Sequence, residues 1–215
     1  STVSGTLGIT SAGAVTDSGT LAITGATTIS ASGQDITLDE SASTFGTLAL
    51  TGANVAVTDA GAVDLGASTV SGTLGITSAG AVTDSGTLAI TGATTISASG
   101  QDITLDESAS TFGTLALTGA NVAVTDAGAT DLGASTVSGT LGITSAGAVT
   151  DSGTLAITGA TTISASGQDI TLDESASTFG TLALTGANVA VTDAGAVDLG
   201  ASTVSGTLGI TSAGA

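Results

Sequence analysis

The chain has 215 residues, 41% of them hydrophobic, and its 18 acidic residues meet no Lys, Arg or His, so the formal net charge is −18. Cys, Trp, Tyr, Met and Pro are also absent. This composition excludes disulfides, thiolate metal sites and the residue types that serve most enzymes as base or nucleophile, and the charge opposes contact with nucleic acid or anionic membranes. We therefore expect no enzyme, no nucleic-acid partner and no membrane insertion.

The sequence is a tandem repeat with a period of about 67 residues. The opening segment STVSGTLGIT recurs beginning at Ser68, Ser135 and Ser202. The chain has no initiating Met and stops inside a copy, so we expect an excerpt of a longer array that forms one continuous solenoid, 1–215. The copies are 1–67, 68–134 and 135–201, with a partial fourth copy at 202–215.

Short runs of alternating apolar and polar residues, separated by glycines, predict strands throughout each copy. In chain order the predicted strands are Thr6–Thr10, Ala14–Asp17, Thr20–Thr24, Thr27–Ser30, Asp35–Asp39, Thr44–Thr51, Asn54–Thr58, Ala62–Leu65 and, from the next copy, Thr69–Ser71. The odd spacing between Phe45 and Leu48 predicts a bulge near Gly46. We expect the rings of Phe45, Phe112 and Phe179 to fill the core or a corner, and the alternative is an exposed contact with a neighbouring rod. No segment keeps a 3.6-residue period, so we expect no helix.

These strands predict a parallel β-solenoid, because stacked turns bury one another's apolar faces and a lone turn cannot offset its ordering entropy. Three strands per turn give about three turns of about 22 residues in each copy, with a rise of about 14 Å per copy. The alternative is a flat two-sided solenoid with about five turns of about 13 residues per copy. A β-sandwich fits less well, because the Asn-Gly and Asp-Gly hairpin signals are absent.

Four segments of each copy resemble a known class of proteins. They are GTLAITG at 19–25, GQDITLD at 33–39, TFGTLALTG at 44–52 and NVAVTD at 54–59. These segments resemble the repeat arrays of bacterial filamentous-haemagglutinin-like exoproteins and β-strand-repeat adhesins. The resemblance implies a right-handed parallel β-helix, export to the cell surface or the medium, and a role in adhesion, biofilm or surface filaments. It transfers no site residues, because binding regions in that class usually lie outside the repeats.

Each copy holds six acidic residues, and the tightest group is Asp35, Asp39 and Glu40. Oxygen ligands suit Ca²⁺, although the glycine-rich nonapeptide of Ca²⁺-binding β-rolls is missing. The competing interpretation is a solvated acidic rim that keeps the rod in solution. No other cofactor is expected. The candidate Ca²⁺ residues are Asp35, Asp39, Glu40, Asp102, Asp106, Glu107, Asp169, Asp173 and Glu174.

Two kinds of threonine bear on function. The outward threonines Thr6, Thr20 and Thr47 follow one another at unequal spacings along the chain, which predicts an irregular array rather than the regular one that ice binding needs. Thr130 stands where the other copies have Val63 and Val197. Since a hydroxyl is no harmless replacement for a methyl group, we expect it to bond a nearby backbone carbonyl, or that copy to be locally weaker.

Taken together, the sequence predicts a structural repeat module of a secreted or cell-surface bacterial fibre or adhesin, acting as a stalk or a self-assembling filament. The expected partners are other copies of the chain, joined end to end or laterally, and surface glycans or matrix. Strand edges without Pro or Lys favour such joining. The alternative function is a Ca²⁺-dependent adhesive binding module.

Overall fold

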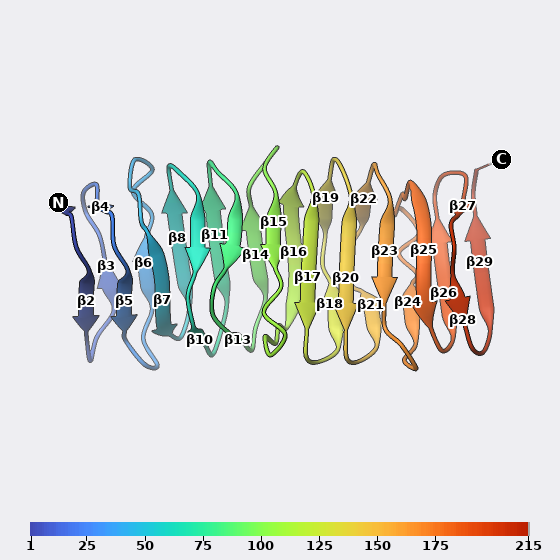
Figure 1. Cartoon of the computed structure of the whole chain (residues 1–215), viewed down its shortest axis with the longest axis horizontal. Coiled ribbons are helices and arrows are strands. Elements are labelled where there is room, and N and C mark those ends of the chain that lie inside the picture. Colours follow the sequence, from blue (N-terminus) through green and yellow to red (C-terminus); the bar gives the residue numbers. More distant parts are fainter. Residues whose placement is uncertain (215) are drawn as a thin grey trace.

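The computed structural model describes residues 1–214 and is an all-β parallel solenoid of about 11 turns (Figure 1). In Figure 1 the nearer strands run downwards and the farther strands upwards while the chain advances from left to right, which makes the winding right-handed. Residues 1–214 contain strands and turns but no helix, and so no helix that could span a membrane. Ala215, the last residue of the expected solenoid, lies outside the described residues.

The strands of the first copy are β1 (Thr2–Val3), β2 (Leu7–Thr10), β3 (Val15–Thr16), β4 (Ala22–Ile23), β5 (Thr27–Ser30), β6 (Ile36–Leu38), β7 (Thr47–Gly52), β8 (Val55–Asp59) and β9 (Val63–Leu65). Those of the second are β10 (Ser68–Val70), β11 (Leu74–Ser78), β12 (Val82–Asp84), β13 (Leu88–Ile90), β14 (Thr94–Ser97), β15 (Ile103–Leu105), β16 (Thr114–Gly119), β17 (Val122–Asp126) and β18 (Thr130–Leu132). Those of the remainder are β19 (Ser135–Val137), β20 (Leu141–Ser145), β21 (Val149–Asp151), β22 (Leu155–Ile157), β23 (Thr161–Ser164), β24 (Ile170–Leu172), β25 (Thr181–Gly186), β26 (Val189–Asp193), β27 (Asp198–Leu199), β28 (Thr203–Val204) and β29 (Leu208–Ser212).

Every strand predicted for a copy is present, and the clearest difference concerns the segment around Phe45. The predicted bulged strand Thr44–Thr51 is instead a corner followed by β7. Thr44 forms only an isolated bridge with Ala22. A Cβ on Gly46 would lie 2.6 Å from the backbone oxygens of both Thr24 and Gly25, so the chain passes directly over the turn below and cannot remain extended there.

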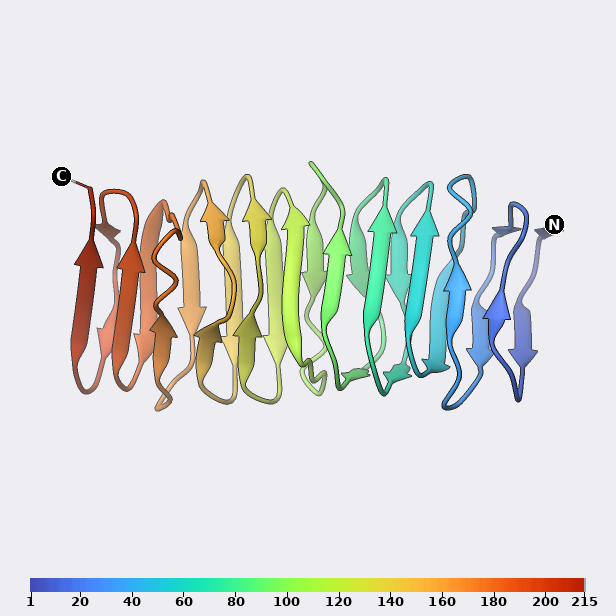
Figure 2. The same ribbon diagram turned by 180° about the vertical axis from the view of Figure 1, so that it is seen from behind.

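Two long sheets face each other across the core (Figures 1 and 2). We call the 14-stranded sheet, nearer in Figure 1, the front sheet, and the 13-stranded sheet, nearer in Figure 2, the back sheet. A short third side joins them, built by β1 and β4, then β10 and β13, then β19 and β22, with isolated bridges at Thr44, Thr111 and Thr178. This short side alternates between edges: β4 lies at the upper edge of Figure 1, β10 and β13 at the lower edge, and β19 and β22 at the upper edge again.

The turns hold about 19 residues, fewer than three equal sides per turn would require. The cause is visible in β7, which occupies the length that β9 and β10 share in the next turn, since Thr47 pairs with Asp64 and Thr51 with Thr69. One turn is therefore closed by two long strands, β7 and β8, and does not need three. The turn of about 13 residues in the flat alternative does not occur. Leu7 pairs with Thr27 in the next turn, and the chain forms both β3 and β4 between these two residues.

At about 19 residues per turn, a 67-residue copy makes about three and a half turns and rises about 17 Å. Because of the extra half-turn, equivalent residues of consecutive copies lie in opposite sheets. Leu7 lies in the front sheet (β2), Leu74 in the back sheet (β11), Leu141 in the front sheet (β20) and Leu208 in the back sheet (β29). Consecutive copies are thus related by half a rotation about the solenoid axis combined with a translation.

The core lies between the two sheets and runs the length of the solenoid. Inward positions are aliphatic and almost completely buried, as in β7, where Leu48 and Leu50 have no exposed surface. Phe45, Phe112 and Phe179 are 6–7% exposed and fill the corners before β7, β16 and β25. The predicted role of these rings as buried corner residues is confirmed.

Candidate functional site

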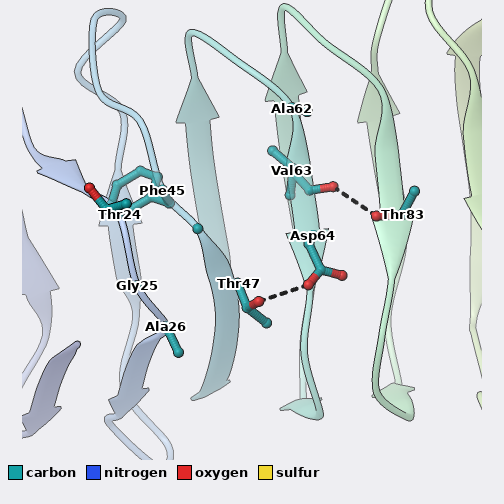
Figure 3. A pocket seen from close by; sticks show the side chains of 10 residues that line it. Thr24, Gly25, Ala26, Phe45, Thr47, Ala62, Val63, Asp64 and Thr83 are labelled. Carbon is teal, nitrogen blue, oxygen red and sulfur yellow. Dashed lines mark hydrogen bonds between the residues drawn. The ribbon is translucent and has the colours of Figure 1, made fainter. Parts of the chain in front are cut away.

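A shallow groove of about 390 Å³ crosses the front sheet where the chain steps over Gly25 and Gly46 (Figure 3). Thr47 Oγ1 donates a hydrogen bond of 2.8 Å to Asp64 Oδ2 on its rim. The close backbone approach at Gly46 forms the step, since any side chain there would meet the carbonyl oxygens of the preceding turn. The groove residues are Thr24, Gly25, Ala26, Phe45, Gly46, Thr47, Ala62, Val63, Asp64 and Thr83.

The chemistry of this groove is that of hydroxyls and a single carboxylate. Asp64 Oδ2 accepts hydrogen bonds from Thr47 Oγ1 at 2.8 Å and from Ser85 Oγ at 2.8 Å. Asp131 Oδ2 does the same with Thr114 and Ser152, on the opposite sheet. Among the described residues that line the groove, Asp64 is the only titratable side chain.

Outside the groove, a ladder of hydrogen-bonded polar side chains crosses three successive turns, at the edge where β6, β8 and β11 begin. Asp35 Oδ1 accepts from the backbone N–H of Asn54 at 3.1 Å and from its Nδ2 at 3.0 Å. Asn54 Oδ1 in turn accepts from the N–H and the hydroxyl of Thr73. Asp102–Asn121–Thr140 and Asp169–Asn188–Thr207 repeat the arrangement. These carboxylates and amides satisfy backbone donors at strand starts, which is a structural task.

The predicted Ca²⁺ residues are not brought together. Asp35 precedes β6, and Asp39 and Glu40 follow it, so an extended strand of about 13 Å separates Asp35 from Asp39. The same holds for Asp102 against Asp106 and Glu107 across β15, and for Asp169 against Asp173 and Glu174 across β24. Residues 1–214 contain no group of three or more acidic side chains placed to hold a metal ion. Ca²⁺ binding at these residues stays a prediction that a titration would check.

The fold instead groups carboxylates from neighbouring turns, and sequence reasoning missed this grouping. Asp84 Oδ1 accepts from the N–H of Asp106 at 2.9 Å, and its Oδ2 lies 3.4 Å from the N–H of Glu107. Asp151 holds Asp173 and Glu174 in the same way, and Asp17 holds Asp39. Burial raises the pKa of Asp84, and the two N–H donors offset part of that rise. The partners come from adjacent turns and are about 22 residues apart in the chain, so no local pattern in the sequence points to them.

Asp59 is a buried carboxylate, 2% exposed, that joins two corners of the solenoid. Its Oδ1 accepts from the N–H of Gly61 at 2.7 Å and its Oδ2 from the N–H of Phe45 at 3.0 Å. Burial raises the pKa of the Asp59 carboxyl above its ordinary value, and the hydrogen bonds from Gly61 and Phe45 work in the opposite direction. A buried acceptor with two backbone donors fixes the corner that Phe45 fills.

Thr130, in the second copy, is 1% exposed and close to the equivalent carboxylate. Its Oγ1 lies 3.0 Å from Ser145 Oγ and 3.3 Å from Asp126 Oδ2. The hydroxyl is therefore hydrogen-bonded, but the expectation that it bonds a backbone carbonyl is wrong. Its partners are side chains and not a backbone carbonyl, because Ser145 already donates towards the carbonyl oxygens of Gly128 and Gly147.

Comparison with known families identifies one match, and it spans the chain. The model of a family described as "Repeats of unknown function (DUF5649)" matches residues 1–51, 52–118, 119–185 and 186–215. No curated protein and no solved structure matches the chain. The two complete matched units keep the period of the repeat and begin at Gly52 and Gly119, the last residues of β7 and β16. The chain therefore belongs to the DUF5649 family of repeats of unknown function.

Proposed function

We propose that the chain is a structural repeat module that acts as a stalk or filament segment of a secreted or cell-surface bacterial protein, and not as an enzyme. The observation that supports this role is the unbroken parallel pairing from β1 to β29 across the copy boundaries. Each turn rests on the one before it, so an added copy lengthens the rod by about 17 Å without changing its cross-section. The function of such a module is geometric: it sets a distance.

The composition of the candidate site supports the same role. Several carboxylates accept hydrogen bonds from backbone N–H groups or from hydroxyls of adjacent turns, as Asp59 and Asp64 do. Side chains that satisfy the backbone in every copy stabilise a repeat, whereas an active site is normally a singular cleft. We propose self-association and contact with surface glycans or matrix as the interactions of such a rod, and no partnership with nucleic acid.

The decisive experiment measures length against copy number. Proteins of two, four and six copies are compared by small-angle X-ray scattering and negative-stain electron microscopy. The maximum dimension should grow by about 17 Å per copy at constant cross-section, and the unfolding midpoint should rise with copy number towards a plateau. A dimension that grows only with roughly the 0.38 power of length, as for a globule, would overturn the proposal.

The location is tested separately. Antibodies against the repeat should label intact cells of the source bacterium, or detect the protein in the medium, without permeabilisation. Labelling confined to permeabilised cells, with none in the medium, would reject the surface and secreted locations. That outcome would leave the rod itself untouched.

A further inference from the structure

The outward surfaces of both sheets carry regular columns of small uncharged residues. Strand pairing stacks Thr58, Thr77, Ser97, Thr118 and Thr136 on the back sheet, and Thr125, Thr144, Ser164, Thr185 and Thr203 on the front sheet. Beside them stack Thr16, Thr37, Ala56, Gly75, Thr95 and Ala116 on the back sheet, and Thr83, Thr104, Ala123, Gly142, Thr162 and Ala183 on the front sheet. These columns do not contain Thr6, Thr20 or Thr47, for which the sequence spacing predicts an irregular array. They form because the pairing brings small side chains from successive turns into register. We call these two surfaces the back face and the front face.

Most of the negative charge lies at the edges of the two faces or inside the solenoid. Asp35, Asp39 and Glu40 lie in connections at the edges, and Asp59 points inwards and is buried. The carboxylates that do lie on a face are Asp64 and Asp198 on the front and Asp131 on the back. Each accepts hydrogen bonds from neighbouring hydroxyls, as Asp64 does from Thr47 and Ser85. A second rod could therefore approach a face without meeting a row of unpaired carboxylates, while the acidic edges stay in water.

We propose that the two faces pack against the faces of other copies of this chain, so that solenoids stack in layers. This inference rests on the proposed structural role and names the surface through which the rods associate. The faces are large enough. About 11 turns at about 4.8 Å, with strands about 17 Å long, give about 900 Å² per face, and a stable interface needs about 800 Å² from each partner.

The half-turn per copy decides what kind of assembly results. Because consecutive copies expose the same residues on opposite sides, Ala56 and Ala190 lie on the back face and Ala123 on the front face. A contact that forms through one face has an equivalent on the other, so association does not close at a dimer. Layers continue to add until charge repulsion between the acidic edges limits them, and salt should strengthen the assembly by screening that repulsion.

The test uses substitutions that load one face or both with charge. Ala56, Ala123 and Ala190 are exposed and are the second residues of β8, β17 and β26. In sedimentation at 0.15 M salt, the unchanged chain should show a mass that rises with concentration beyond two chains. Ala56→Glu with Ala190→Glu should stop at twice the 19.7 kDa chain mass, because the front face still pairs. Adding Ala123→Glu should leave single chains.

The matched control places the same number of charges on the edges. Ser41→Glu with Ser175→Glu, and the triple variant that adds Ser108→Glu, change exposed positions in edge loops. They should assemble like the unchanged chain. Circular dichroism and melting curves show that every variant is folded before its mass is compared. The face variants and the edge variants carry equal net charge, so any difference between them reports location.

Two results would overturn the inference. One is an unchanged chain that stays monomeric at every concentration and salt level, which needs no variant to observe. The other is edge variants that dissociate as fully as the face variants. The proposed rod is judged independently, from the scattering length of the monomeric triple face variant, so a failure of stacking and a failure of the rod are distinguishable.

Discussion

Position 63 and position 130 are the same site in consecutive copies, one occupied by Val and the other by Thr, and each side chain is 1% exposed. In the first copy the neighbouring carboxylate, Asp59, accepts from the backbone N–H groups of Gly61 and Phe45. In the second, Thr130 adds its hydroxyl to the same corner, within reach of Asp126 and Ser145. The rest of the two copies is identical in sequence, so the pair is a natural substitution experiment.

The difference shows why a buried hydroxyl is accepted at this site. A buried hydroxyl without a hydrogen-bond partner lowers the free energy of unfolding, whereas a buried hydroxyl that donates to an acceptor lowers it little. The corner was polar before the substitution, because it already held a carboxylate and a serine. Thr94 is the contrasting case in the same copy. It is completely buried, and within residues 1–214 its Oγ1 has no hydrogen-bond partner.

The largest effect is expected from deleting the buried carboxylate. Asp126→Ala leaves the N–H of Gly128 without its side-chain acceptor and removes one of the two partners of the Thr130 hydroxyl. It should lower the local free energy of unfolding by about 2–4 kcal/mol. Asp59→Ala should cost less, because Val63 offers that carboxylate no hydroxyl. Native-state hydrogen exchange at the amides of Gly128 and Gly61 measures both losses locally, which suits an array that need not unfold in one step. Equal losses in the two copies would remove the distinction.

Replacing the unpartnered threonine should have the next largest effect, with the opposite sign. Thr94→Val keeps the shape of the side chain and removes an unsatisfied buried hydroxyl, so it should stabilise the protein by about 1 kcal/mol. Thr27→Val and Thr161→Val should behave alike, since their Oγ1 atoms are also without partners in the described chain. The exposed neighbour Thr95 is the control. Thermal melting of these variants, compared with Thr95→Val, checks the sign.

The pH dependence of stability should reveal the contribution of the Asp126 carboxylate. Burial raises the pKa of Asp126 above its unfolded value, while the donors from Gly128, Thr130 and Phe112 oppose the rise. The folded state therefore binds a proton before the unfolded state does as pH falls. The stability from this group is fully present below the unfolded pKa and is lost as pH rises through the folded pKa. Asp126→Asn should flatten the melting temperature across that window, and an unchanged slope would contradict the assignment.

The smallest effects belong to the exchange itself. Thr130→Val and Val63→Thr should each change the free energy of unfolding by less than about 1 kcal/mol, because the polar corner accommodates either side chain. Urea unfolding of the two single variants and of the double exchange measures this. A loss of several kcal/mol for Val63→Thr would mean that Asp59 and Ser78 are not available as partners for the new hydroxyl.

The sequence predicts every strand of a copy because strand formation here is a local matter. Alternation such as Val55-Ala-Val57 fixes which side chains face inwards, and glycines such as Gly52 mark where a run can end. The spacing of Phe45 from Leu48 breaks the alternation, and it predicted a bulge where the structure has a corner. The repeat, the absence of helix and the solenoid follow from these local patterns together with the need of each turn for a neighbour.

What the sequence left open is how far the chain travels before it comes back over itself. That distance depends on contacts between turns, such as the approach of Gly46 to Thr24 and Gly25. It also depends on whether a break is a corner, as between β7 and β8, or a bend opposite one continuous strand, as between β9 and β10, which both pair with β7. In the tertiary structure one turn holds about 19 residues, so a 67-residue copy makes about three and a half turns. That half-turn places equal residues on opposite faces, and the stacking brings Asp84 to Asp106. The sequence of one copy predicts neither feature. A local pattern indicates where a strand begins, but the contacts of that strand depend on which residues of the preceding turn lie beneath it.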